Sequence, residues 1–130
     1  MTKRLFCAAA LCMAGMLAVS AQSVRFNNEG KLKIVQFTDI HWRAGDPATA
    51  DAAANMNRVL DEEKPDLVVY TGDVTTAKPA TEGLDKALEP VISRGLPYAI
   101  TFGNHDDEQD LTRPQLYDYV KKKQGCLDAK

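Results

Sequence analysis

The sequence is poor in histidine and cysteine, and it has no excess of positive charge. Its 130 residues include two His and three Cys, and 16 basic residues stand against 18 acidic ones. Proteins that bind nucleic acid usually present a basic surface, so we expect no nucleic-acid partner. Hydrophobic residues make up 45% of the chain, which is enough for the core of one small domain. A disordered chain is therefore not expected.

The first 21 residues are expected to be a secretory signal peptide. Lys3 and Arg4 precede an apolar stretch at residues 5–19, and the segment ends at Ala21 after Ser20. Cleavage after Ala21 would leave 14 basic and 18 acidic residues, a net charge of −4. The apolar stretch is shorter than the roughly 20 residues that a membrane span needs. We expect an exported protein, periplasmic or extracellular, without a stable membrane span after cleavage.

Only one cysteine follows the expected signal peptide. Cys7 and Cys12 lie within it, so Cys126 alone remains. A single cysteine cannot form an internal disulfide, so Cys126 is either a buried thiol or has a partner beyond residue 130. The bulky Leu11 before Cys12 is unlike a lipoprotein signal, which makes a lipid anchor the less favoured alternative.

The remainder of the chain alternates between strand and helix patterns. The expected strands lie at 24–26, 31–37, 66–70 and 97–102, and the expected helices at 46–64, at 81–94 and from 112 onward. The turn residues at 27–30 predict a hairpin between the first two strands. Pro90 predicts a kink or break in the second helix. The continuously apolar strand 66–70 is typical of a strand buried on both faces.

This alternation predicts an α/β fold with a mostly parallel sheet built from β-α-β-α-β units. In such sheets reactive groups gather beyond the carboxyl ends of the strands. Each of the three core strands is followed by residue types that bind metals or transfer protons, namely Asp39, His41, Asp73, Asn104, His105 and Asp106. The spacings are 34 residues from Asp39 to Asp73 and 31 from Asp73 to Asn104. Each is about one strand-helix repeat, so these residues should meet at one sheet edge.

The local pattern also indicates a metal site. Asp39 and His41 are two residues apart, and in extended backbone such side chains point the same way. Gly72 and Gly103 allow tight turns before Asp73 and Asn104. Carboxylate, imidazole and amide ligands without thiolate suit Zn, Mn or Fe. Each motif taken singly also fits an ordinary turn, cap or structural histidine. The conjunction of three motifs after three strands is what favours a site.

The ordered set D-x-H, G-D and G-N-H-D resembles the calcineurin-like metallophosphoesterase family over about residues 32–117. FGNHDDE followed by LTR looks most like its purple acid phosphatase-related branch. The resemblance implies a phosphoesterase that hydrolyses phosphomono- or diesters through water activated by two metal ions. It implies that Asp39 and His41 bind the first metal, that Asp73 bridges both, and that Asn104 binds the second.

The same resemblance assigns His105 to the substrate phosphate rather than to a metal. His105 would stabilise the transition state or protonate the leaving oxygen, and Asp106 would orient its ring. Asp107 and Glu108 are expected to be solvated, because adjacent acids cannot all face one site.

Two features depart from the family pattern. Purple enzymes carry Tyr three residues after the G-D aspartate, where this chain has Thr76, so no purple chromophore is expected. The family also has further histidines downstream, whereas none follows His105. We therefore expect residues 22–130 to be the N-terminal portion of a metallophosphoesterase domain with little activity alone. The alternative is a non-catalytic scaffold of the same fold that binds a partner protein.

Overall fold

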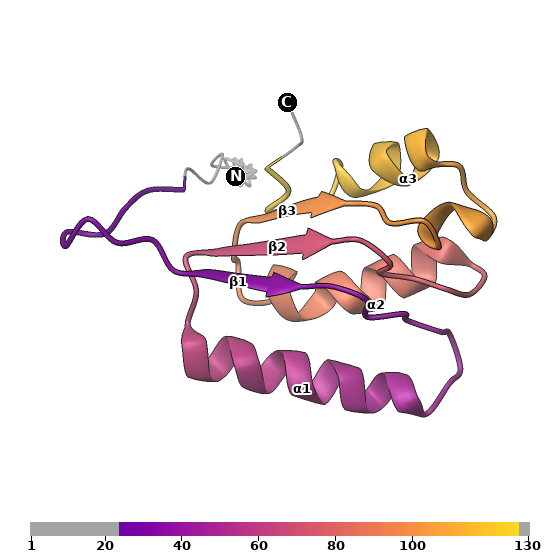
Figure 1. The fold of residues 1–130 in the computed structure, drawn as a ribbon, viewed down its shortest axis with the longest axis horizontal. Coiled ribbons are helices and arrows are strands. Elements are labelled where there is room, and N and C mark those ends of the chain that lie inside the picture. Colours follow the sequence, from indigo (N-terminus) through magenta and orange to yellow (C-terminus); the bar gives the residue numbers. More distant parts are fainter. Residues whose placement is uncertain (1–23, 128–130) are drawn as a thin grey trace, which may run out of the picture.

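A computed structural model describes residues 24–127 (Figure 1). Three strands and three α-helices alternate along the chain, with a short 3₁₀ helix before the last helix. They are β1 (Ile34–Phe37), α1 (Ala48–Glu63), β2 (Leu67–Thr71), α2 (Ala80–Ile92), β3 (Tyr98–Thr101), η1 (Asp106–Glu108) and α3 (Arg113–Val120). The expected signal peptide lies outside the described residues. Within residues 24–127, no helix combines the length and the apolar character that a membrane crossing requires.

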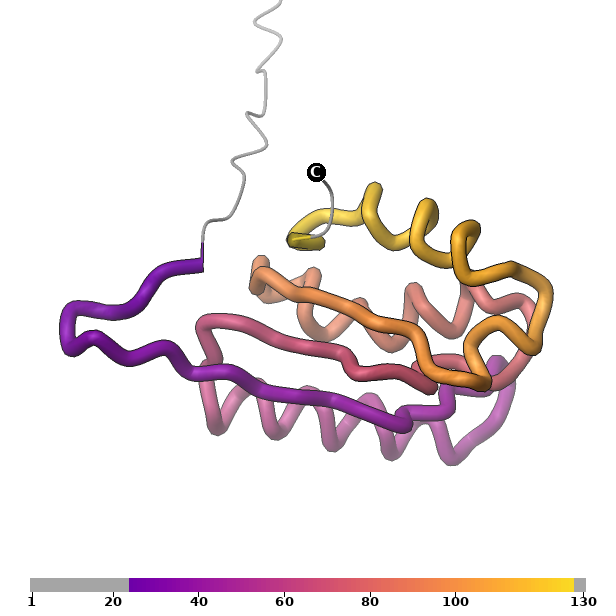
Figure 2. Tube along the Cα trace, turned by 45° about the horizontal axis from the view of Figure 1, so that its top comes forward, coloured from indigo at the N-terminus to yellow at the C-terminus, as the bar shows by residue number. Residues whose placement is uncertain are grey.

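The three strands form one parallel sheet in the order β1-β2-β3. Each strand is joined to the next through a helix, which confirms the predicted α/β fold with β-α-β-α-β units. α1 and α2 lie together along one face, and α3 lies beside β3 at the sheet edge (Figures 1 and 2). All three strands therefore end at the same edge, as the sequence pattern required.

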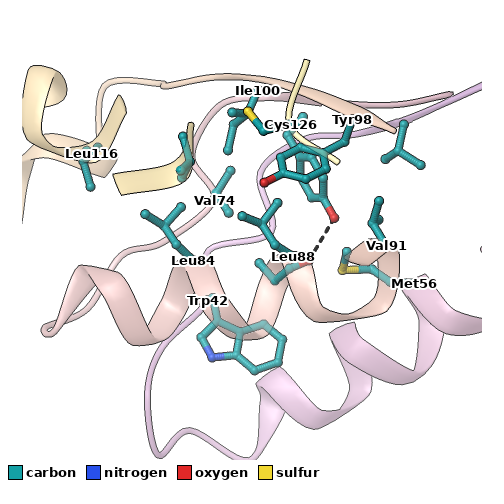
Figure 3. Close-up of a cluster of buried hydrophobic side chains, with 14 of the residues drawn as sticks. Trp42, Met56, Val74, Leu84, Leu88, Val91, Tyr98, Ile100, Leu116 and Cys126 are labelled. Atoms are coloured by element: carbon teal, nitrogen blue, oxygen red, sulfur yellow. Dashed lines mark hydrogen bonds between the residues drawn. The ribbon is translucent and has the colours of Figure 1, made fainter. Parts of the chain in front are cut away.

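The core lies between the sheet and the two helices that cover it. Val68, Tyr70, Tyr98 and Ile100 project from the sheet and are almost completely buried. Leu84, Leu88 and Val91 of α2 approach them, with Met56 of α1 and Cys126 at the margins (Figure 3). The buried Tyr70 hydroxyl donates a hydrogen bond to the Ala87 carbonyl at 2.9 Å. Burial beside Tyr98 raises the pKa of this phenol.

Cys126 is buried within the described residues. It pairs through its backbone with Tyr98 of β3.

The opposite face of the sheet is less covered. Ile34 is 51% exposed, and Leu67, Val69 and Ala99 are half-buried. The expectation that β2 is buried on both faces is therefore wrong within residues 24–127. Both crossover helices lie on one side, so only alternate residues of each strand reach the core.

Two further local expectations, a hairpin before β1 and a kink or break at Pro90, are not met in full. The turn at residues 27–30 forms, with Asn27 Oδ1 accepting the N–H groups of Glu29 and Lys31 at 2.9 Å each. Residues 24–26 are nevertheless not a strand, because the segment before β1 extends away from the sheet (Figure 2). α2 also continues through Pro90 to Ile92. Pro90 lies in the last turn, where the missing N–H removes one bond near an end that frays in any case.

Candidate active site

The segments that follow β1, β2 and β3 all leave the sheet at its carboxyl edge (Figure 1). The Asp39 N–H donates to the Gly72 carbonyl at 3.1 Å, and the His41 N–H donates to the Asp73 carbonyl at 3.0 Å. Trp42 then pairs with Thr75 as an isolated parallel bridge. The loop after β1 is thus fixed against the loop after β2 by backbone hydrogen bonds. The predicted ligands Asp39, His41 and Asp73 lie in these two loops.

Left-handed backbone is concentrated at this edge. Asp39, His41 and Asp73 have φ angles of 52°, 51° and 51°, and Lys64 is the one other non-glycine residue with positive φ within residues 24–127. Such conformations are uncommon for residues with a Cβ and cost about 1–3 kcal/mol each. They cluster at functional sites, where the surrounding structure holds them. The extended geometry expected for Asp39 and His41 is therefore wrong, although both side chains still reach one point.

Asp39, His41 and Asp73 form a compact group of potential ligands. One donor atom from each residue lies within 4.8 Å of the other two. His41 Nε2 is 3.9 Å from Asp39 Oδ1 and 3.8 Å from Asp73 Oδ2. Donors that share a zinc ion each lie about 2.0–2.2 Å from it, so two of them can be at most about 4.4 Å apart. The two separations from His41 fall within this limit, so the donor types and these two distances are compatible with a shared metal ion.

Gly72 and Gly103 bring the loops after β2 and β3 into direct contact. Gly72 has a φ of 110°, and a Cβ there would lie 2.8 Å from the Gly103 nitrogen. A Cβ on Gly103 would lie 2.6 Å from the Asp73 nitrogen and 2.7 Å from its Cγ. The backbones can approach this closely only without side chains at both positions. The third strand end is thereby placed against the group of ligands.

His105 lies next to this group. Its ring centroid is 5.7 Å from that of His41, with an edge-to-face arrangement. Its backbone N–H donates to Asp73 Oδ1 at 2.9 Å. Asn104 is the exposed residue before it, and lies between Gly103 and His105 in the same fixed loop. The structure thus brings Asp39, His41, Asp73 and His105 to one edge, with Asn104 in the adjoining loop.

The partner of the His105 ring differs from the expected one. His105 Nδ1 is 2.7 Å from Glu108 Oε2, whereas the Asp106 carboxylate is directed into the protein and accepts backbone N–H groups. His105 precedes the 3₁₀ helix, in which residues three apart lie one above the other, so Glu108 rather than Asp106 returns to the ring. This hydrogen bond raises the pKa of the His105 imidazole.

Glu108 and Arg113 were missed as contributors to the site. Arg113 Nη2 donates to the Gly103 carbonyl at 2.7 Å, and its Nε donates to Asp107 at 2.9 Å. The hydrogen bond from Arg113 lowers the pKa of the Asp107 carboxyl. The run of acids after His105 could have suggested a carboxylate partner for its ring. The 3₁₀ helix that makes Glu108 this partner has no clear signal in the sequence.

A sequence model of calcineurin-like phosphoesterases matches residues 32–129. The chain belongs to the calcineurin-like phosphoesterase family. The match extends from the residues before β1 past the end of α3 and includes every candidate ligand. This confirms the family expected from the three motifs, and the parallel half-sheet agrees with it.

Several curated proteins are similar to this family member. It is 30% identical to "Probable inactive purple acid phosphatase 14" of Arabidopsis thaliana over 89% of this chain and 33% of the relative. It is 39% identical to "Phosphatase DCR2" of Saccharomyces cerevisiae over 74% of this chain and 20% of the relative. The chain thus spans a third or less of the length of these two relatives. No solved structure matches.

Thr76 occupies the position at which purple enzymes carry tyrosine. Its hydroxyl donates to the His41 carbonyl at 3.3 Å and accepts a hydrogen bond from Arg43 Nε at 3.2 Å. In this calcineurin-like phosphoesterase the position therefore secures the backbone of a candidate ligand.

Proposed function

We propose that the protein hydrolyses phosphate esters, mono- or diesters, at a site formed by the loops after β1, β2 and β3. Asp39, His41, Asp73 and Asn104 would hold two metal ions of the Zn, Mn or Fe type. Such a pair, when bound, lowers the pKa of a bound water and stabilises the charge on phosphoryl oxygens. The observation that carries the proposal is the convergence of three left-handed residues whose donor atoms fit a shared ion.

Asp73 is the residue best placed to serve two ions. Its side chain is 13% exposed, against 62% for Asp39 and 42% for His41, so it lies deepest in the group. Oδ2 faces His41, while Oδ1 accepts the His105 N–H from the third loop. A carboxylate between the first and third loops can neutralise positive charge on both sides, which a neutral amide cannot do.

His105 is suited to protonate the leaving oxygen. The hydrogen bond of Nδ1 to Glu108 fixes the ring and directs Nε2 away from that carboxylate. Glu108 also stabilises the imidazolium form, which is the form that carries a proton on both nitrogens. An acid whose pKa is close to the working pH is effective in proton transfer.

The proposal is tested by Asp73→Asn in the full-length protein, of which residues 22–130 are expected to be the N-terminal portion of the catalytic domain. We expect loss of bound Zn and Mn by elemental analysis and loss of hydrolysis of p-nitrophenyl phosphate and its bis ester. The change preserves size but removes the negative charge between the loops. Asp51→Asn, an exposed carboxylate in the first turn of α1, is the matched control and should behave as the wild type. Unchanged turnover in Asp73→Asn would refute the assignment.

The non-catalytic alternative has one specific observation in its favour. The less covered sheet face presents the exposed Ile34 beside the half-buried Val69 and Ala99, apolar residues of the kind found where another protein binds. A full-length protein that binds metal but hydrolyses neither ester would favour this scaffold.

A further inference from the structure

Asp106 is the one charged side chain that is fully buried within residues 24–127. Its Oδ2 accepts the N–H groups of Asp73 at 2.9 Å and of Gly103 at 2.7 Å. Its Oδ1 accepts those of Val74 at 2.8 Å and of Thr75 at 3.0 Å. One carboxylate therefore binds four backbone donors from the loops after β2 and β3. Charge-assisted bonds of this kind are short and about twice as strong as neutral ones.

We propose that Asp106 is a positioning residue that sets the direction of the Asp73 carboxylate toward the metal. This inference rests on the proposed function. It extends that function because the four N–H groups that hydrogen-bond to the Asp106 carboxylate belong to the backbone, not to the candidate ligand atoms or the His105 ring. It acts through the backbone of the residue on which the site depends.

The hydrogen bonds define how this positioning works. Asp106 fixes the Asp73 nitrogen, which holds a residue with a φ of 51° in its left-handed conformation. The same carboxylate fixes Gly103, and two residues later the His105 N–H binds Asp73 Oδ1 at 2.9 Å. With Oδ1 engaged, Oδ2 is the oxygen that faces His41 Nε2 at 3.8 Å. The backbone and one carboxylate oxygen of Asp73 are thus fixed, and the other oxygen is presented to the ligand group.

This arrangement requires a carboxylate rather than any polar side chain of the same shape. An amide at position 106 offers one acceptor oxygen and one NH₂ group that can only donate. Whichever way it is oriented, two of the four backbone N–H groups lose their acceptor and face another donor. One orientation affects Asp73 and Gly103 directly, and the other affects Val74 and Thr75 in the same loop. Asp106→Asn should therefore disturb Asp73 without creating a cavity.

The test measures metal binding by Asp106→Asn in the full chain, with Asp110→Asn as the matched control. Asp110 lies in the same segment, and its Oδ1 accepts the Ala80 N–H at 2.8 Å, so the control also removes a carboxylate-amide bond. Calorimetric titration with Mn²⁺ should show affinity reduced by about 10- to 100-fold for Asp106→Asn, the usual range for residues that orient ligands. The Asp110→Asn variant should keep the wild-type affinity.

The visible spectrum of bound Co²⁺ depends on the arrangement of its ligands, so it should not change in a variant that is merely less stable. It should change in Asp106→Asn, because the direction of a ligand has changed, and stay the same in Asp110→Asn. If Asp106→Asn does not fold, Asp106→Glu keeps the charge and the acceptors but shifts them by one methylene. That variant should fold, with weaker Mn²⁺ binding and an altered Co²⁺ spectrum.

The outcomes separate this inference from the function on which it rests. Wild-type affinity and an unchanged spectrum in Asp106→Asn, or in Asp106→Glu where Asn does not fold, would overturn the positioning role alone. A full-length wild-type protein that binds neither Mn²⁺ nor Co²⁺ would overturn the proposed function and this inference with it.

Discussion

Gly103→Ala is the smallest substitution that should disable the site. The added Cβ would lie 2.6 Å from the Asp73 nitrogen and 2.7 Å from Asp73 Cγ. Unbonded heavy atoms normally lie about 3.5 Å apart, so Asp73 or its neighbour must move by roughly 1 Å. Gly103 itself does not adopt a left-handed φ. Any effect of the substitution is therefore steric rather than a consequence of backbone strain.

The structure sets the size of the effect. Overpacking costs about 1–3 kcal/mol of unfolding free energy, and each kcal/mol lowers the midpoint by roughly 4–8 °C for a domain of about 100 residues. A misplacement of about 1 Å at reacting groups can reduce turnover on the order of 100-fold. We expect both changes in Gly103→Ala, measured by thermal unfolding without metal and by hydrolysis of p-nitrophenyl phosphate with Mn²⁺.

Gly45→Ala is the control for the loss of a glycine. Gly45 has a φ of 78° and no atom within 4 Å of the position of a Cβ, so the substitution strains the backbone without any clash. It should lower stability by about 1–2 kcal/mol and leave Mn²⁺ affinity unchanged. The reasoning fails if Gly103→Ala hydrolyses p-nitrophenyl phosphate as fast as the wild type, since the contact with Asp73 would then be irrelevant to the site.

Two further substitutions test the proton donor and the core. His105→Ala should reduce turnover of p-nitrophenyl phosphate, by about 10²–10⁴-fold for a general acid, while elemental analysis finds the same metal content. A lower metal content would instead identify His105 as a ligand. Tyr70→Phe removes the hydrogen bond to Ala87 and should lower the unfolding free energy by about 0.5–1.5 kcal/mol in denaturant titrations. An unchanged denaturation midpoint would show that the hydrogen bond of this buried hydroxyl does not contribute to stability.

The parallel topology made most of the site predictable from the sequence. Hydrophobic runs located β1, β2 and β3, and the alternation with helices placed their carboxyl ends at one edge. Asp39, His41 and Asp73 could therefore be grouped before any coordinates were known. The spacing of one strand-helix repeat carried this inference, because it depends on chain topology and not on local conformation.

The local conformation of the site was not predictable in the same way. Left-handed φ angles at Asp39 and His41 arise from hydrogen bonds to the loop after β2, which are long-range contacts without a signal in neighbouring residues. The sequence also did not predict that Glu108, rather than Asp106, would hydrogen-bond to the His105 ring. A 3₁₀ turn brings Glu108 under the His105 ring, while Asp106 is directed to N–H groups more than 30 residues away in the chain.

The strained residues of the site support one another across the loops. Three left-handed residues at about 1–3 kcal/mol each approach the 5–15 kcal/mol by which domains are typically stable. Each of the three donates its N–H outside its own loop: Asp39 to Gly72, His41 to Asp73, and Asp73 to Asp106. If Asp73 lost its hydrogen bond to Asp106 and moved, its carbonyl would no longer be in place to accept the His41 N–H. The ligands should thus become ordered as one unit, only when all three strand ends are assembled.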